Sequence, residues 1–162
     1  MSAYDLAAWT DFANTVAGGA AALAGLLFVG LSLNLSEVLR YPGVPSRAAA
    51  TLGLTVAILL TAIFVATPGQ SALALSIEIA VLGLVTAALV LEAMRHQRAG
   101  PHRGRVLTSM VMLLLPALLL MVAAASLWSG RGGGLYWVTA AVTTGFVAAT
   151  ANAWVLVVEI KR

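Results

Sequence analysis

Apolar residues occupy five long and nearly uninterrupted stretches of the chain, and short polar or basic segments separate them. A transmembrane helix needs about 20 mostly apolar residues, and each stretch meets that length. The pattern therefore predicts an all-α fold: a polytopic transmembrane helical bundle with five spans, forming one integral membrane domain over residues 1–162. The predicted helices cover about 12–38, 48–67, 71–94, 106–128 and 135–158.

Composition supports the membrane class and excludes three others. Hydrophobic residues make up 61% of the 162 residues and charged residues 9%, and the chain contains no cysteine. Soluble domains average roughly 45–50% apolar and about 25% charged residues. A water-soluble globule is therefore excluded. An intrinsically disordered chain, which needs low hydrophobicity, and a disulfide scaffold, which needs cysteine, are excluded as well.

Basic residues are distributed unevenly between the two predicted sides of the membrane. Cytoplasmic segments next to transmembrane helices carry an excess of Lys and Arg. Arg131 falls on one side, and eight basic residues fall on the other: Arg40, Arg47, Arg95, Arg98, Arg103, Arg105, Lys161 and Arg162. We therefore expect the N-terminus outside and the C-terminus in the cytoplasm.

Small residues at regular spacing mark two predicted helix-packing faces. Helices in a bilayer associate where small side chains let their backbones approach closely. The two sets are Ala141, Gly145, Ala149 and Ala153 in the last span, and Ala17, Ala21 and Gly25 in the first. Packing within one protomer is the favoured interpretation, and contact within a homo-oligomer or with another membrane protein is the alternative. Pro116 removes a backbone donor midway along the fourth span, which predicts a kink.

Glu78 is the charged residue whose position the predicted topology does not explain. It lies seven residues inside the outer end of the third span, about 10 Å deep at 1.5 Å per residue. Ionisable residues at such depth usually face a bundle interior or a wet cavity. Matching depths along the helices gives Thr61 and either Thr143 or Thr144 as hydrogen-bond donors. Glu78 is then either part of an interhelical polar contact or an ion or proton site.

A second polar set lies in the cytoplasmic half of the predicted spans. Its members are Ser32, Asn34, Thr55, Thr86 and Asn152. Ordinary hydrogen bonding between helices is the favoured interpretation. The alternative is a polar track that continues from Glu78 to the cytoplasmic face.

The longest predicted connection, Arg95 to Arg105, is strongly basic. Its four arginines are Arg95, Arg98, Arg103 and Arg105, and it also holds both histidines of the chain. A basic cytoplasmic segment attracts anionic lipid headgroups with about 1 kcal/mol per residue. We therefore expect contact with anionic lipid, with an acidic partner protein as the alternative. Nucleic acid is not an expected partner, because the segment is short and lies against the bilayer.

The sequence contains no candidate residues for enzyme catalysis. Cysteine is absent, the two histidines share one segment without a carboxylate at metal-ligand spacing, and no Asp or His lies within a predicted span. We expect no catalytic residues, no metal site and no cofactor. The glycines at 130 and 132–134 lack the preceding strand and the Lys-Ser/Thr ending of a phosphate-binding loop, so they predict a flexible outer turn.

Four segments carry a resemblance to a known group of proteins. They are AAALAGLLFVG at 20–30, PGQS at 68–71, GLYW at 134–137 and NAWVLVVEI at 152–160. Together they resemble a family of small, largely uncharacterised bacterial multi-pass inner-membrane proteins, some of which are labelled modulators of the membrane-bound AAA protease FtsH. The resemblance implies a protein of the bacterial cytoplasmic membrane and supplies no active-site residues.

Two functions are consistent with these patterns. The first is a non-enzymatic accessory, regulatory or scaffolding subunit that acts through helix-helix and lipid contacts. The second is an oligomeric ion channel or proton-coupled transporter in which Glu78 is the intramembrane site. The first is favoured because the sequence shows neither internal repeats nor paired interrupted helices, which are typical of transporters.

Overall fold

All regular secondary structure is helical in the part of the chain that the computed structural model describes, which is residues 3–40, 43–96 and 103–160. A short 3₁₀ helix, η1 (Leu6–Trp9), leads directly into α1 (Thr10–Leu33). The helices that follow are α2 (Leu35–Arg40), α3 (Val44–Ala66), α4 (Ala72–His96), α5 (Arg103–Ser129) and α6 (Leu135–Ile160). The all-α prediction is confirmed for these residues.

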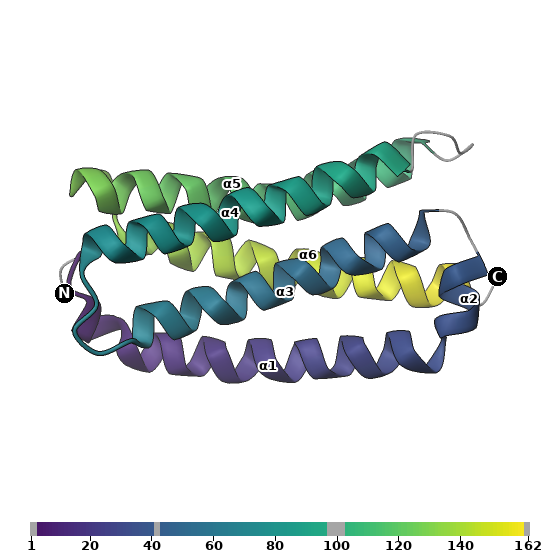
Figure 1. Cartoon of the computed structure of the whole chain (residues 1–162), viewed down its shortest axis with the longest axis horizontal. Coiled ribbons are helices and arrows are strands. Elements are labelled where there is room, and N and C mark those ends of the chain that lie inside the picture. The colour runs from purple at the N-terminus through teal and green to yellow at the C-terminus, as the bar shows by residue number, and fades with distance from the viewer. Residues whose placement is uncertain (1–2, 41–42, 97–102, 161–162) are drawn as a thin grey trace.

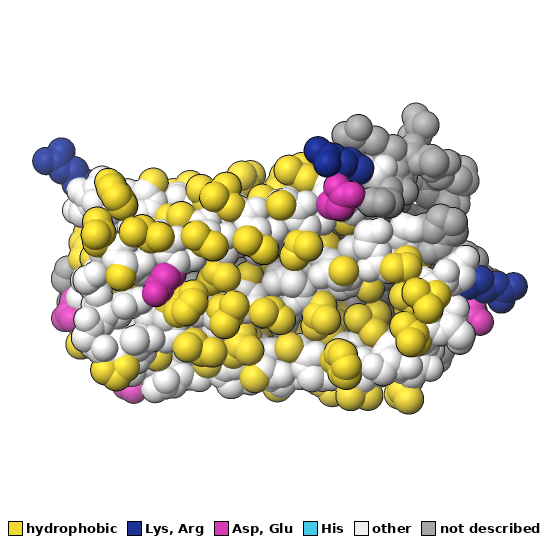
Figure 2. All heavy atoms as spheres, in the orientation of Figure 1, with side chains coloured by type: hydrophobic (Ala, Val, Ile, Leu, Met, Phe, Trp, Pro, Cys, Tyr) yellow, Lys and Arg dark blue, Asp and Glu magenta, His cyan; other side chains and the backbone are white. Residues whose placement is uncertain are grey.

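Five helical segments are long and apolar enough to cross a membrane, as the sequence predicts. They cover Leu6–Leu33, Val44–Ala66, Ala72–Arg95, Met110–Ser129 and Leu135–Val155. The long helices run lengthwise along the molecule, and the two termini lie at opposite ends (Figure 1). Figure 2 shows apolar side chains along the long face and charged side chains towards the two ends. This arrangement is that of a multi-pass membrane protein.

Two helix boundaries differ from the sequence prediction. The first helix ends at Leu33 because Asn34 leaves the helical conformation, with φ −116° and ψ 22°, and α2 follows as a separate helix. Helix α3 begins at Val44 and has Pro45 in its first turn. Proline suits that position because the first N–H groups of a helix have no acceptor within it. The segment predicted to connect the first two spans is therefore partly helical.

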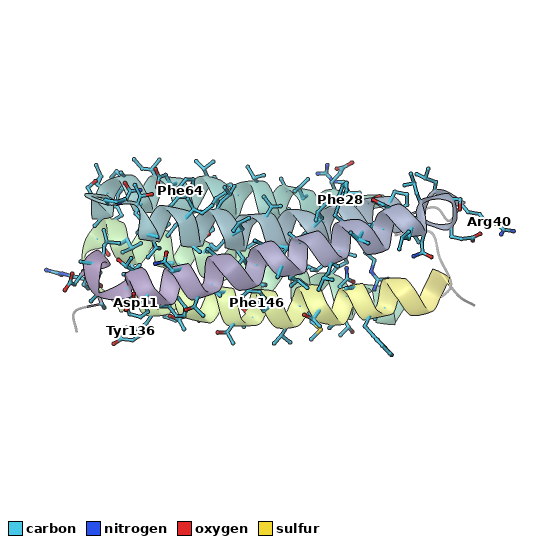
Figure 3. The ribbon with its side chains drawn as sticks, turned by 90° about the horizontal axis from the view of Figure 1, so that it is seen from below. Asp11, Phe28, Arg40, Phe64, Tyr136 and Phe146 are labelled. Atoms are coloured by element: carbon cyan, nitrogen blue, oxygen red, sulfur yellow. The ribbon has the colours of Figure 1, made fainter. Side chains whose placement is uncertain are left out.

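Helix α3 lies at the centre of the bundle and α1 at its edge. Helix α3 packs against α1, α4 and α6, whereas α4 with α5 and α5 with α6 form the other large contacts. Over the most apolar stretch of each helix, 56% of the α3 residues are buried and 11% of the α1 residues. Seen from below, α1 runs along the outside of the molecule (Figure 3). One face of α1 contacts the bundle, and the rest is exposed.

The small residues of α6 lie inside the bundle. Ala141, Gly145 and Ala149 are buried, and Ala153 is half-buried. A Cβ atom added to Gly145 would lie 2.6 Å from Ile58 Cδ1 on α3 and 3.6 Å from the Cβ of Pro116 on α5. Glycine is therefore required for the close approach of three helices. Pro116 is buried at this crossing, inside an α5 that is assigned as a single helix.

Candidate functional site

A buried arginine links α3 to α6 near the end of the molecule where the C-terminus lies. Arg47 is in the first turn of α3, and only 4% of its surface is exposed. Its Nε donates a hydrogen bond of 2.7 Å to Oδ1 of Asn152, which is also buried. A hydrogen bond to a charged group stabilises a fold by about 1.5–3 kcal/mol, roughly twice the value of a neutral one.

Two threonines extend this contact along α3. The Asn152 amide donates to the Thr51 hydroxyl, which in turn donates to the Arg47 carbonyl at 2.8 Å. One turn further along, Thr55 donates to the Thr51 carbonyl at 3.0 Å. Both threonine side chains are buried. We call Arg47, Thr51, Thr55 and Asn152 the polar cluster; these hydrogen bonds connect its four buried residues.

Arg47 does not lie in a polar connection at the membrane surface, as was predicted. It is instead buried in α3. A signal was present: Arg47, Thr51 and Thr55 are spaced four residues apart, which places them on one face of a helix. Arg47 was interpreted only as a marker of the cytoplasmic side, so its four-residue spacing from Thr51 was overlooked.

The structure divides the second predicted polar set. Asn152 and Thr55 belong to the polar cluster, and Thr86 is buried in α4. Ser32 is exposed on α1. The side chain of Asn34 donates to the carbonyl of Gly30 at 2.8 Å, within its own chain segment. A hydrogen-bonded cluster between α3 and α6 is therefore observed where a set spanning four helices was expected.

Glu78 has a different hydrogen-bond partner from those expected. It is half-buried on α4, and its carboxylate accepts a hydrogen bond from the Gln70 side-chain amide. Gln70 lies between α3 and α4, after the turn at Thr67–Gly69, so the contact links this connection to the second turn of α4. The amide donor supplies the hydrogen bond that a carboxylate needs when it leaves bulk water.

The three threonines matched to Glu78 by depth are placed elsewhere. Thr61 is buried and donates to the Ala57 carbonyl at 2.8 Å, and Thr144 donates to the Ala140 carbonyl at 2.7 Å. Thr143 is exposed. A threonine inside a helix commonly bonds the carbonyl four residues earlier, so a matching depth does not make it a donor to another helix.

The arginines of the longest connection are described only in part. Arg95 is exposed and pairs with Glu92 at 3.1 Å, one turn earlier on α4. Arg98 and the side chains of Arg103 and Arg105 lie outside the described residues. Exposed ion pairs of this kind add little to stability.

The opposite end of the molecule carries an ordered network where a flexible turn was predicted. The Ser126 hydroxyl donates to the Arg131 carbonyl at 2.5 Å and accepts a hydrogen bond from the Gly134 N–H at 2.8 Å. The Tyr4 hydroxyl accepts a hydrogen bond from the Gly133 N–H at 3.2 Å. We call this set the end network. It ties the connection between α5 and α6 to Ser126 and Tyr4, contacts that the prediction of a flexible turn did not include.

The N-terminal segment packs directly on that connection. The Leu135 N–H, which begins α6, donates to the Ala3 carbonyl at 2.9 Å. Gly134 has φ +49°, and a Cβ atom there would lie 2.8 Å from Cε1 of Tyr4, so only glycine fits without strain. The Trp9 ring meets the Tyr136 ring edge to face, with centroids 5.0 Å apart. The beginning of the chain and α6 are therefore held together.

The outward face of α1 is not covered by the other described helices. Asn14, Gly18, Ala21, Gly25 and Phe28 are all exposed, and Ala17 beside them is half-buried. A Cβ atom added to Gly18 or Gly25 would meet nothing within 4 Å. Two of the small residues predicted to pack a helix, Ala21 and Gly25, therefore lie on the surface. We call these five exposed residues the α1 outer face.

Comparison with known proteins assigns no family to this chain. The structural features that bear on its function are the polar cluster, the end network and the α1 outer face. No protein-family model, curated protein or solved structure matches this chain.

Proposed function

We propose that this protein is a non-enzymatic accessory or scaffolding subunit of a bacterial cytoplasmic membrane, in which a rigid bundle presents α1 to a second membrane helix. In this proposal the C-terminus and the basic connection after α4 face the cytoplasm, where they contact anionic lipid headgroups. The single observation that carries the proposal is the exposure of α1. It is as apolar as a membrane span needs to be, yet it contacts the bundle along one face only.

The small side chains on the outer side of α1 support the docking of another helix there. In a bilayer, apolar side chains gain nothing by leaving lipid, so helices associate through close packing and hydrogen bonds. A helix that only contacts lipid has no need of small residues on its outer side. Helix α1 carries Gly18, Ala21 and Gly25 there, and their surroundings within the chain are open.

The remainder of the fold supports a scaffold because both ends are fixed by specific contacts. The polar cluster links α3 to α6 at one end, and the end network links the N-terminal segment to α6 at the other. Helix α1 begins at this second end, so the end network sets its direction. A partner helix would therefore meet a face that is already in position, which lowers the entropy cost of binding.

Photocrosslinking in native membranes tests this function. A photoreactive amino acid replaces Gly25 on the α1 outer face or, as the matched control, Leu84, an exposed apolar residue of α4. We expect a discrete protein adduct from position 25 and only lipid adducts from position 84. Protein adducts of equal yield at both positions, or none at position 25, would contradict the proposal.

A further inference from the structure

We propose that α2 is an interfacial helix. It lies along the membrane surface at the end of the molecule where the C-terminus lies, with two leucines against lipid acyl chains and an arginine among the headgroup phosphates. The chain turns a corner to form this helix. The Asn34 side chain donates to the Gly30 carbonyl near the end of α1, and the Asn34 carbonyl accepts the Val38 N–H of α2 at 2.9 Å. Figure 1 shows α2 crossing that end of the molecule, from the end of α1 towards the start of α3.

The residues of α2 point in three directions around its axis. Successive residues of an α-helix are about 100° apart. Val38 is 4% exposed, so it marks the side of α2 that faces the bundle. Ser36 and Arg40 lie nearly opposite Val38. Leu35 and Leu39 share one flank between these two sides, and their exposed fractions are 54% and 65%.

The position of α2 relates these three sides to the membrane. Because α2 crosses the end of the bundle, the side opposite Val38 points away from the spans, along the membrane normal. Arg40 projects beyond the end of the molecule (Figure 3), where its side chain is 69% exposed and lies 3.7 Å from the Glu37 carboxylate. The leucine flank points along the membrane plane instead. An apolar flank in that plane, next to a basic residue, is typical of a helix at the boundary between headgroups and acyl chains.

Trp154 gives independent evidence for the depth of α2. The hydrogen bond from Arg47 to Asn152 places these two residues at one level of the bundle. Trp154 follows Asn152 by two residues, which brings it about 3 Å nearer the end of the molecule and level with the start of α3. Its side chain is 71% exposed, and tryptophan is enriched where a membrane meets water. Helix α2 ends just before α3 begins, so it lies at this interface.

The exposed leucines of α2 differ from those of the long helices. Leu84 of α4 is exposed within a span, where lipid surrounds it in any case. Leu35 and Leu39 lie outside the five spans, so their contact with lipid depends on α2 lying against the leaflet. In water, their apolar surface would lose the stabilisation that burial gives. The inference goes beyond the proposed function, because it holds whichever helix docks on α1.

The natural absence of cysteine allows a single nitroxide label to be attached to α2. Leu39→Cys carries the label on the leucine flank, and Ser36→Cys is the matched control, since Ser36 is also exposed but points away from the bundle. The full chain is reconstituted in vesicles of phosphatidylethanolamine and phosphatidylglycerol. Collisions of the label with oxygen, which concentrates among acyl chains, are compared with collisions with a water-soluble nickel chelate present on both sides of the membrane.

We expect the ratio of oxygen to nickel collisions to be severalfold higher at position 39 than at position 36. Equal ratios at the two positions would place the leucines in water and overturn the proposal. A label at position 39 that neither reagent reaches would show that protein covers this flank, which would overturn it as well.

A second measurement separates the lipid contact from the packing of Val38 on the bundle. With the label at position 36, Leu35→Ser and Leu39→Ser together should increase the mobility of the label, because α2 loses its contact with the leaflet. Leu84→Ser is the control and should leave the mobility unchanged. An unchanged mobility in the double variant would contradict the role of the leucines. Photocrosslinking at position 25 does not involve α2, so either failure would leave the proposed function standing.

Discussion

Helices α1 and α6 both carry small residues at helix-packing spacing, yet the two faces have opposite surroundings. On α6, Gly145 lies against Ile58 and Pro116. On α1, Gly25 has nothing within 4 Å of the position where a Cβ atom would lie. Both helices meet the length and hydropathy of a membrane span. The difference shows that, in a membrane protein, small-residue spacing identifies a face suited to docking but not whether the chain itself supplies the partner.

The largest expected difference in the free energy of unfolding is between alanine substitutions of Asn152 on α6 and of Asn14 on α1. Asn152→Ala removes the acceptor of the buried Arg47 Nε–H and should lower the free energy of unfolding by about 3 kcal/mol, because a buried charged donor is left unsatisfied. Asn14→Ala should leave the free energy of unfolding unchanged, since its side chain is exposed and makes no hydrogen bond within the described residues. Unfolding of detergent-solubilised chain in increasing SDS, followed by circular dichroism, measures both.

The same substitution at Gly145 on α6 and at Gly25 on α1 tests whether the two helix faces have different surroundings. Gly145→Leu should lower the free energy of unfolding by about 2–3 kcal/mol, because the first added carbon already overlaps Ile58 and overpacking costs that much. Gly25→Leu should leave the thermal midpoint unchanged, because a Cβ atom there meets nothing within 4 Å. Equal destabilisation by the two substitutions would show that α1 is packed in a way this structure does not contain.

Substitution of Gly134, the residue before α6, should have a smaller effect on stability, at the end network. Gly134→Ala should cost about 1–2 kcal/mol or more, because φ is positive and the added methyl would overlap the Ala3 carbonyl oxygen and the Tyr4 ring. Gly130→Ala is the control, since φ there is also positive but the space is open. A loss larger for Gly134→Ala than for Gly130→Ala, measured by thermal unfolding in detergent, isolates the contact with the N-terminal segment from backbone strain.

Substitution of Glu78 should have the smallest effect on the free energy of unfolding. Glu78→Gln retains an acceptor for the Gln70 amide, so the unfolding free energy should change by less than about 0.5 kcal/mol, the usual range for partly exposed substitutions. Proton and cation flux into vesicles containing the purified chain should be the same for both forms. A flux that Glu78→Gln abolishes would replace the accessory function with the channel or transporter hypothesis.

The sequence was sufficient to predict the five spans because hydropathy over about 20 residues is set by the bilayer and not by the neighbours of a helix. It was insufficient for the contacts of Glu78, because depth along a helix gives no information on which way a side chain points. Thr61 and Thr144 were matched by depth, yet each donates to its own helix. Gln70 was missed because it belongs to a connection rather than to a span.

Arg47 shows how one sequence signal can conceal another. An arginine next to a helix end is ordinarily a marker of the cytoplasmic side, and Pro45 lies two residues before Arg47. The same proline also suits the first turn of a helix. Asn152 was identified as a polar residue in need of a partner, but its partner lies more than 100 residues earlier in the chain. Pairing at such separation requires the packing of α3 against α6, which hydropathy alone does not specify.

The end network has a consequence for how the protein is made. The Gly133 N–H that reaches the Tyr4 hydroxyl is 129 residues from it along the chain. A ribosome synthesises the N-terminal segment first, so that segment remains without its binding site until the start of α6 has emerged. Completion of the bundle is therefore a late step of biogenesis, and any nascent chain that stops before Gly133 lacks the end network, although η1 also packs against α3.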